Sequence, residues 1–156
     1  MSPMNAFLLL QGIETLSLRM DRHLSNTKEI LQYLDNHEQV SWVNHPDMPG
    51  HDSNDIAKKY MPKGAGSIIT FGVKGGRDAG QAFIENVKLA SHLANVGDAK
   101  TLIIHPATTT HSRIDAKALV AAGITEDMIR ISVGIENVSD ITQDFNNGFR
   151  AAKKFI

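Results

Sequence analysis

Apolar residues recur at helical spacing through the first third of the chain. They lie three, four or seven positions apart, at Leu9, Ile13, Leu16, Met20, Leu24, Leu31 and Leu34. This spacing predicts a continuous apolar stripe on a helical surface. Ser2 and Pro3 suit the start of that helix, and Gly12 is a candidate break within it. We expect the stripe to pack in the core, with a partner-binding helix as the alternative.

The rest of the chain alternates between short strand patterns and helical patterns. Strands are predicted at 40–43, 67–73, 101–104 and 129–133, and helices at 56–61, 78–93, 115–122 and from 139 or 140 onward. The order favours an α/β chain of the α+β two-layer sandwich type. We expect a small, mainly antiparallel sheet with helices on one face.

Composition and charge narrow the possible functions. The chain has 156 residues and a formal net charge of −1, so it has no basic excess for binding nucleic acid. It has no cysteine, which excludes a disulfide, a thiol nucleophile and a thiolate zinc site. The apolar run Ala6–Leu10 is far shorter than the ~20 residues that span a bilayer. The first cation is Arg19, which disfavours a signal peptide, and we expect a cytoplasmic protein without membrane contact.

Arg130 is the strongest candidate for binding chemistry. It lies in the strictly alternating strand 129–133, on the face opposite Ile129 and Ile131. A guanidinium group there can hold a carboxylate through two parallel hydrogen bonds. The alternative is an arginine that pairs with a neighbouring Glu or Asp on an exposed sheet face.

Other motifs are weaker. His105 with His111, and His45 with His51, flank two loops, but neither pair has the spacing of a metal-binding helix, so no metal site is predicted. The glycine pair Gly75-Gly76 suits a turn between a strand and a helix better than a phosphate-binding loop. No G-x-S-x-G motif marks a serine nucleophile. The residues alone therefore indicate an α+β domain with a candidate anion-binding arginine.

Three long sequence runs resemble a known family and so indicate more than the individual motifs do. Residues 1–23, 91–112 and 123–141 resemble segments of the Cys/Met-metabolism family of pyridoxal-phosphate (PLP) enzymes. The runs at 58–66 and 94–98 resemble most closely its O-acetylhomoserine sulfhydrylase branch, the O-acetylhomoserine aminocarboxypropyltransferases. The resemblance implies the small C-terminal domain of a fold-type I PLP transferase. It implies a linking helix region at 1–37 and a substrate-binding domain at 38–156, without the PLP-binding large domain.

The resemblance also implies what the chain lacks. Family members hold PLP on a lysine in an [ST]-x-[ST]-K run, and none of the ten lysines here lies in such a run. We therefore expect no catalytic residue in this chain and no PLP bound by it alone. PLP is expected in the full-length enzyme, which would be a homo-oligomer, commonly a tetramer in the family.

The same resemblance assigns substrate-binding residues. Arg130, in the run IRISVGIE at 129–136, stands where the family binds the substrate α-carboxylate. Asn95 replaces a serine that helps hold this carboxylate, and the Val96 N–H is expected to assist. Thr109 replaces a pocket-lining methionine.

The implied reaction of the full-length enzyme belongs to transsulfuration and methionine biosynthesis. It replaces the acetate of O-acetyl-L-homoserine with sulfide or a thiol, giving homocysteine or methionine. The alternative, from a different class, is a standalone non-catalytic module that binds an amino acid or a partner subunit.

Overall fold

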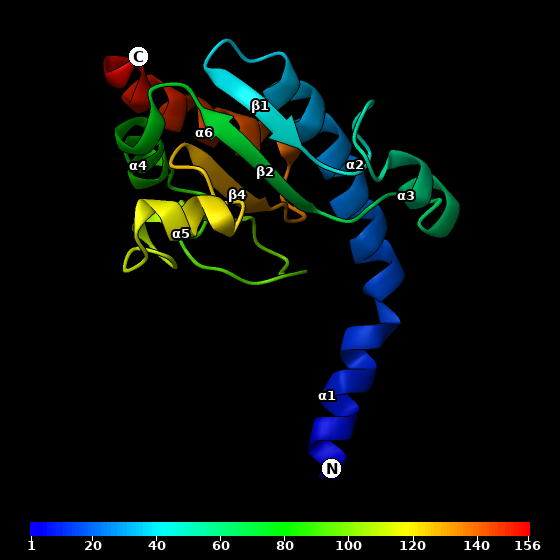
Figure 1. The fold of residues 1–156 in the computed structure, drawn as a ribbon. Helices are drawn as coiled ribbons and strands as arrows, with labels where there is room; N and C mark the ends of the chain where they lie inside the picture. Colours follow the sequence, from blue (N-terminus) through cyan, green and yellow to red (C-terminus); the bar gives the residue numbers. More distant parts are fainter.

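A computed structural model describes residues 1–156 apart from the side chain of Ala116. Two consecutive helices lead into a domain of short strands and helices (Figure 1). The elements are α1 (Pro3–Glu14), α2 (Leu16–Asp35), β1 (Val40–Asn44), α3 (Asn54–Tyr60), β2 (Ile68–Val73), α4 (Gly76–Asn86), β3 (Leu102–Ile104), η1 (Pro106–Thr108), α5 (Ala116–Ala121), β4 (Met128–Ser132), α6 (Val138–Ala152) and η2 (Lys153–Phe155). Most predicted boundaries differ from these by one or two residues.

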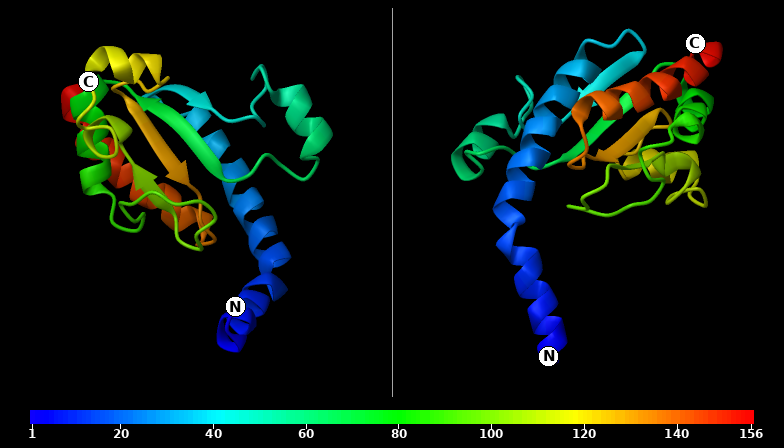
Figure 2. Two further views of the ribbon diagram at one scale, coloured as in Figure 1. Left: turned by 60° about the horizontal axis from the view of Figure 1, so that its bottom comes forward. Right: turned by 180° about the vertical axis from the view of Figure 1, so that it is seen from behind.

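The four strands form one antiparallel sheet in the order β1-β2-β4-β3. Helices α2, α4 and α6 lie together on one face, and α5 lies on the other side (Figures 1 and 2). The predicted α+β sandwich, with a small antiparallel sheet and a helical layer on one face, is therefore confirmed, and the short helix α5 lies outside that layer.

The core lies between the sheet and the three helices. Alternate residues of β2 and β4 point into it, and Phe71, Ile129 and Ile131 are fully buried. Phe83 on α4 meets Phe149 on α6 edge to face, with ring centroids 4.7 Å apart. Aromatic pairs in this geometry stabilise a core beyond the area that they bury. The sheet and the α4–α6 pair thus share one continuous apolar core.

The N-terminal stripe differs from its prediction in two ways. The break falls at Thr15, between α1 and α2, and Gly12 stays inside α1. Only the C-terminal part of the stripe, including Leu31 and Leu34, is buried. No residue of α1 is buried, because the helix extends away from the domain (Figure 2). Core packing is thus the correct interpretation for the end of α2 and the wrong one for α1. None of the described helices combines the length and apolar composition needed to cross a membrane.

Helix α4 is shorter than predicted. It ends at Asn86 rather than 93, and Val87 has an extended backbone, with φ −79° and ψ 147°. The next three backbone N–H groups donate to the Asp144 carboxylate on α6 instead of to helix carbonyls. A distant side chain therefore ends this helix, although its apolar periodicity continues.

Candidate functional site

Arg130 lies in the middle of β4 on the sheet face opposite the helical layer. Thr70 on β2 and Ile104 on β3 are its direct neighbours across the sheet. Asn44 on β1 extends this row and donates from Nδ2 to the Thr70 hydroxyl at 3.1 Å. The Arg130 side chain is half-buried. The alternation of β4 therefore places the guanidinium group as predicted, on a partly desolvated open face.

Arg130 has no ion-pair partner among the residues that the structure describes. Within 4.0 Å, one ion pair joins Arg77 to Glu126, and a second close contact of a carboxylate joins Asp47 to the ring of His45. Internal pairing with a neighbouring carboxylate, the alternative raised by the sequence, is thus absent from this part of the molecule. A half-buried guanidinium with its five donors available matches the geometry of a ligand carboxylate.

Asn95 and Val96 lie in an exposed loop that leads into β3. The Val96 side chain is 69% exposed, and its backbone N–H donates to Asn95 Oδ1 at 2.9 Å. The N–H expected to contact a ligand is therefore already engaged by the neighbouring side chain.

Thr109 follows β3 and the short helix η1, and its side chain is half-buried. Its hydroxyl donates to the His105 carbonyl at 2.8 Å, so the side chain is fixed within its own turn. The four predicted residues thus come from three segments: β4, the loop before β3 and the turn after it. The two loop segments flank opposite ends of β3, the edge strand that pairs with β4.

His105 anchors the turn that carries Thr109. The ring is fully buried, with Nδ1 2.8 Å from the Thr108 hydroxyl and Nε2 2.7 Å from the Glu126 carbonyl. A carbonyl can only accept, so Nε2 carries the proton and Nδ1 accepts from the hydroxyl. Burial lowers the pKa of His105, which keeps the ring neutral. Gly80 makes room, since a Cβ there would lie 2.7 Å from Nε2.

Both ring nitrogens of His105 are thus engaged with protein atoms. Across the described residues there is no group of three or more His, Cys, Asp or Glu side chains that could hold a metal ion.

Sequence reasoning missed a buried polar patch on α2. His23, Asn26 and Thr27 are almost fully buried. His23 Nδ1 lies 2.6 Å from the Val133 carbonyl, and Asn26 Nδ2 donates to the carbonyls of Gly134 and Glu136 at 3.0 and 2.8 Å. These contacts tie α2 to the segment directly after Arg130. Their burial could have been inferred from the sequence, because they lie on the same helical face as Ile30 and Leu34.

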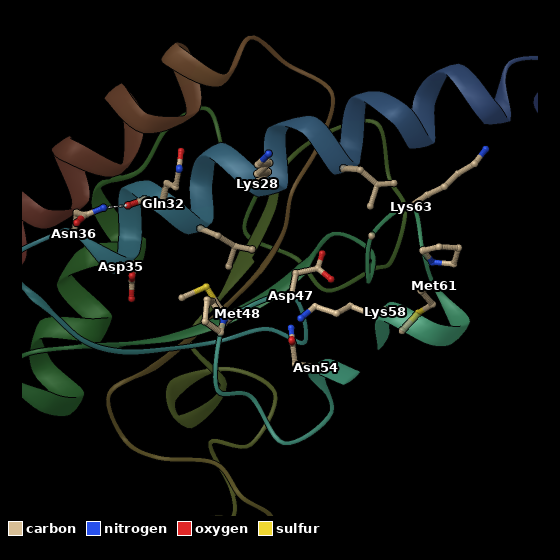
Figure 3. Close-up of a pocket in the computed structure, with 15 residues that line it drawn as sticks. Lys28, Gln32, Asp35, Asn36, Asp47, Met48, Asn54, Lys58, Met61 and Lys63 are labelled. Carbon is tan, nitrogen blue, oxygen red and sulfur yellow. Dashed lines mark hydrogen bonds between the residues drawn. The ribbon is translucent and has the colours of Figure 1, made fainter. Parts of the chain in front are cut away.

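A separate cavity lies elsewhere. A hollow of about 820 Å³ separates α2 from the segment that runs through α3, with Lys28 on one side and Asp47, Met48 and Lys58 on the other (Figure 3). None of the four predicted site residues lines it. The cavity and the predicted carboxylate site are therefore separate features.

The chain's residues do not fit the attachment of PLP. A Schiff-base lysine is normally buried beside its cofactor, which lowers its pKa. All ten lysines of this chain are exposed, and none lies in the family's lysine motif. The residues here can supply a carboxylate-binding arginine but no covalent anchor for the cofactor.

The fold is thus an antiparallel sheet backed by three helices, with an arginine on its open face that has no ion-pair partner in the described chain. The chain belongs to the family of Cys/Met metabolism PLP-dependent enzymes, which it matches over residues 1–150. This confirms the resemblance seen in the sequence.

Two curated relatives show how much of such a protein the chain represents. It is 48% identical over 151 residues to the homocysteine synthase of Schizosaccharomyces pombe, covering 97% of this chain and 35% of that protein. It is also 48% identical over 141 residues to an O-acetyl-L-homoserine sulfhydrylase of Thermus thermophilus, covering 90% of this chain and 34% of that one. The chain therefore spans about a third of the length of these relatives.

Solved structures share the fold. Cystathionine gamma synthase from Xanthomonas oryzae pv. oryzae, in complex with cystathionine, has a TM-score of 0.87 and 34% identity, covering 99% of this chain and 40% of that one. An O-acetylhomoserine (thiol)-lyase from Campylobacter jejuni, carrying N'-pyridoxyl-lysine-5'-monophosphate, has a TM-score of 0.86 and 36% identity, covering 96% and 36%. Both agree with the expected fold-type I class.

Proposed function

We propose that this chain is the substrate-binding domain of an O-acetylhomoserine sulfhydrylase. The intact enzyme would replace the acetate of O-acetyl-L-homoserine with sulfide or a thiol, giving homocysteine or methionine and releasing acetate. The observation that carries the proposal is Arg130, half-buried and without an ion-pair partner in the described chain. Family membership and the sulfhydrylase names of the relatives support it.

In this proposal Arg130 holds the α-carboxylate of the amino acid by a bidentate ion pair. Fixing the carboxylate orients the γ-carbon and its leaving group, and such positioning accounts for much of the rate that enzymes gain. Asn95 and the Val96 N–H supply further donors, and Thr109 limits the width of the pocket. PLP, the electron sink, would be held by a part of the enzyme outside these residues.

Substitution of Arg130 tests the carboxylate site in the intact protein. We expect Arg130→Ala to raise KM for O-acetyl-L-homoserine by ~10–100-fold, the loss typical of a charged hydrogen-bonded contact. Arg130→Lys keeps the charge but loses the bidentate geometry, so it should lie between wild type and alanine. Arg150→Ala, at an exposed position on α6, is the matched control. Unchanged KM and kcat in Arg130→Ala would remove this residue from the site.

The 156-residue chain by itself should neither bind PLP nor turn over the substrate. Its lysines are all exposed and lie outside the family's motif. Absorbance spectroscopy with added PLP, followed by borohydride reduction and mass spectrometry, checks this. A stoichiometric pyridoxyl-lysine adduct at one position would contradict the proposal.

We further propose that the intact enzyme is a cytoplasmic homo-oligomer. Light scattering of the purified protein gives its assembly state, and fractionation of source cells gives its compartment. An immunoblot with an antibody to this domain gives the native chain length. A band near 17.1 kDa would favour the standalone module instead.

A further inference from the structure

Two acidic side chains hold the base of the loop that carries Asn95 and Val96. The loop, residues 92–100, is closed at its base by backbone contacts between Ser91 and β3. Ser91 N–H donates to the Thr101 carbonyl at 2.9 Å, and Ile103 N–H donates to the Ser91 carbonyl at 3.0 Å. Between these points most loop side chains are exposed. The position of the tip therefore depends on what holds the two sides of the base.

Asp144 holds the incoming side of the base. Its carboxylate, on α6, is 5% exposed and accepts the backbone N–H groups of Lys88, Leu89 and Ala90 at 2.7, 2.9 and 3.0 Å. It takes part in no ion pair in the described chain. Three converging N–H groups can hold a buried carboxylate without a cation. Asp144 thus fixes the backbone up to the residue before Ser91.

Glu136 holds the outgoing side. Its carboxylate accepts the Thr101 backbone N–H at 2.7 Å and the Thr101 hydroxyl at 2.9 Å. The Gly134 N–H donates to that same hydroxyl at 2.9 Å, and a Cβ at Gly134 would lie 2.2 Å from Glu136 Oε2. Because Glu136 and Gly134 continue the chain from β4, this network joins the loop base to the strand that carries Arg130.

We propose that Asp144 and Glu136 are positioning residues, which hold the loop tip at a fixed place relative to Arg130 so that both contact one substrate carboxylate. The inference rests on the proposed function. The register supports it: Ile135 N–H donates to the Ala99 carbonyl at 2.9 Å, so the loop base is aligned with the extension of β4. A displaced base would move Asn95 and Val96 away from a carboxylate held by Arg130.

The test uses Asp144→Asn and Glu136→Gln in the intact protein. Each variant keeps the size of the side chain but presents an NH₂ group where an oxygen accepted an N–H. We expect KM for O-acetyl-L-homoserine to rise about tenfold, the equivalent of about 1.4 kcal/mol, with kcat changed much less. Asp140→Asn is the matched control, an exposed carboxylate one turn earlier on α6. Assays run well below the melting temperature of each variant, so that lost fold stability does not lower the active fraction.

A substrate without the carboxylate separates positioning from general damage. With the α-carboxamide of O-acetyl-L-homoserine, the wild type should be poor and the two variants should be no worse than the wild type. A merely structural role would lower kcat/KM equally for O-acetyl-L-homoserine and for its α-carboxamide. That outcome overturns the inference. So does an unchanged KM in both variants.

The outcomes also separate the two proposals. If Arg130→Ala raises KM while Asp144→Asn and Glu136→Gln do not, the positioning role fails and the proposed function stands. If the intact wild-type protein does not turn over O-acetyl-L-homoserine, the proposed function fails and the positioning role with it. Hydrogen exchange on the intact protein adds a direct check, because Asp144→Asn should speed exchange at Lys88, Leu89 and Ala90. Unchanged exchange at these three residues would contradict the proposal that Asp144 holds the base of the loop.

Discussion

Three histidines couple the stability of this domain to pH. Burial lowers the pKa of His37, His45 and His105 below the usual value of 6.5. The unfolded chain therefore takes up protons near pH 6.5 that the folded chain does not. Stability is fully present above that pH and falls as the pH drops through 6.5 towards the lower folded-state pKa values.

We expect the free energy of unfolding to decrease between pH 7.5 and pH 5, as measured by urea denaturation. His105→Gln keeps an N–H donor near the Nε2 position for the Glu126 carbonyl, but it cannot titrate. Its stability should change less over this interval than that of the wild type. His92→Gln, at an exposed position, serves as the control and should retain the wild-type slope. An equal slope in His105→Gln would exclude this ring as a contributor.

At the residue scale, the sequence allowed the face of Arg130 to be predicted but not its surroundings. Alternation along β4 depends only on neighbours in the chain, so the guanidinium had to point away from Ile129 and Ile131. The absence of an ion-pair partner in the described chain depends on which distant segments meet at that face. The hydrogen bond between Val96 N–H and Asn95 depends on local loop geometry, which no periodic pattern encodes.

At the element scale, close approach between α4 and α6 depends on a residue without a side chain. A Cβ at Gly148 would lie 2.8–3.0 Å from carbon atoms of the Phe83 ring. That ring is fully buried and packs against Phe71 and Phe145 as well as Phe149, so it has little room to move.

Gly148→Ala should therefore destabilise the domain by about 1–3 kcal/mol, the usual cost of overpacking a core. Gly12→Ala is the matched control, because it lies in helix α1 and the added Cβ would meet nothing within 4 Å apart from its chain neighbours and the local helix backbone. This variant should be neutral or slightly stabilising, since alanine favours a helix more than glycine does. Urea unfolding of both variants measures the change in the free energy of unfolding. Equal values would show that the α4–α6 contact adjusts to the added methyl group without cost.

Local sequence patterns predict most boundaries of the helices and strands, but not the end of α4. Strands and most helix boundaries follow from local periodicity, because the alternating residues themselves build the core. Helix α4 ends early for a different reason: Asp144, 54–56 residues further along the chain, captures the next three N–H groups. The pattern through Val87 and Ala90 still marks buried or partly buried positions, but in a bent, non-helical segment.

At the scale of the whole molecule, α1 is the least self-sufficient element. Phe7, Leu8, Leu9 and Leu10 follow one another around the helix and are 55%, 60%, 55% and 61% exposed. A helix that is apolar on all sides is normally buried within a larger protein. Contiguous apolar surface of this kind marks an interaction site or causes association.

We therefore expect the 156-residue chain to self-associate through α1 at micromolar concentrations. Removal of residues 1–14 should yield a monodisperse monomer by light scattering, because the buried part of α2 and the sheet stay intact. Phe7→Lys together with Leu10→Lys should act in the same direction without shortening the chain. If the unaltered 156-residue chain stays monomeric, the apolar surface of α1 is tolerated in solvent without a partner. That result would favour the standalone module over a domain whose first helix packs against the rest of a larger enzyme.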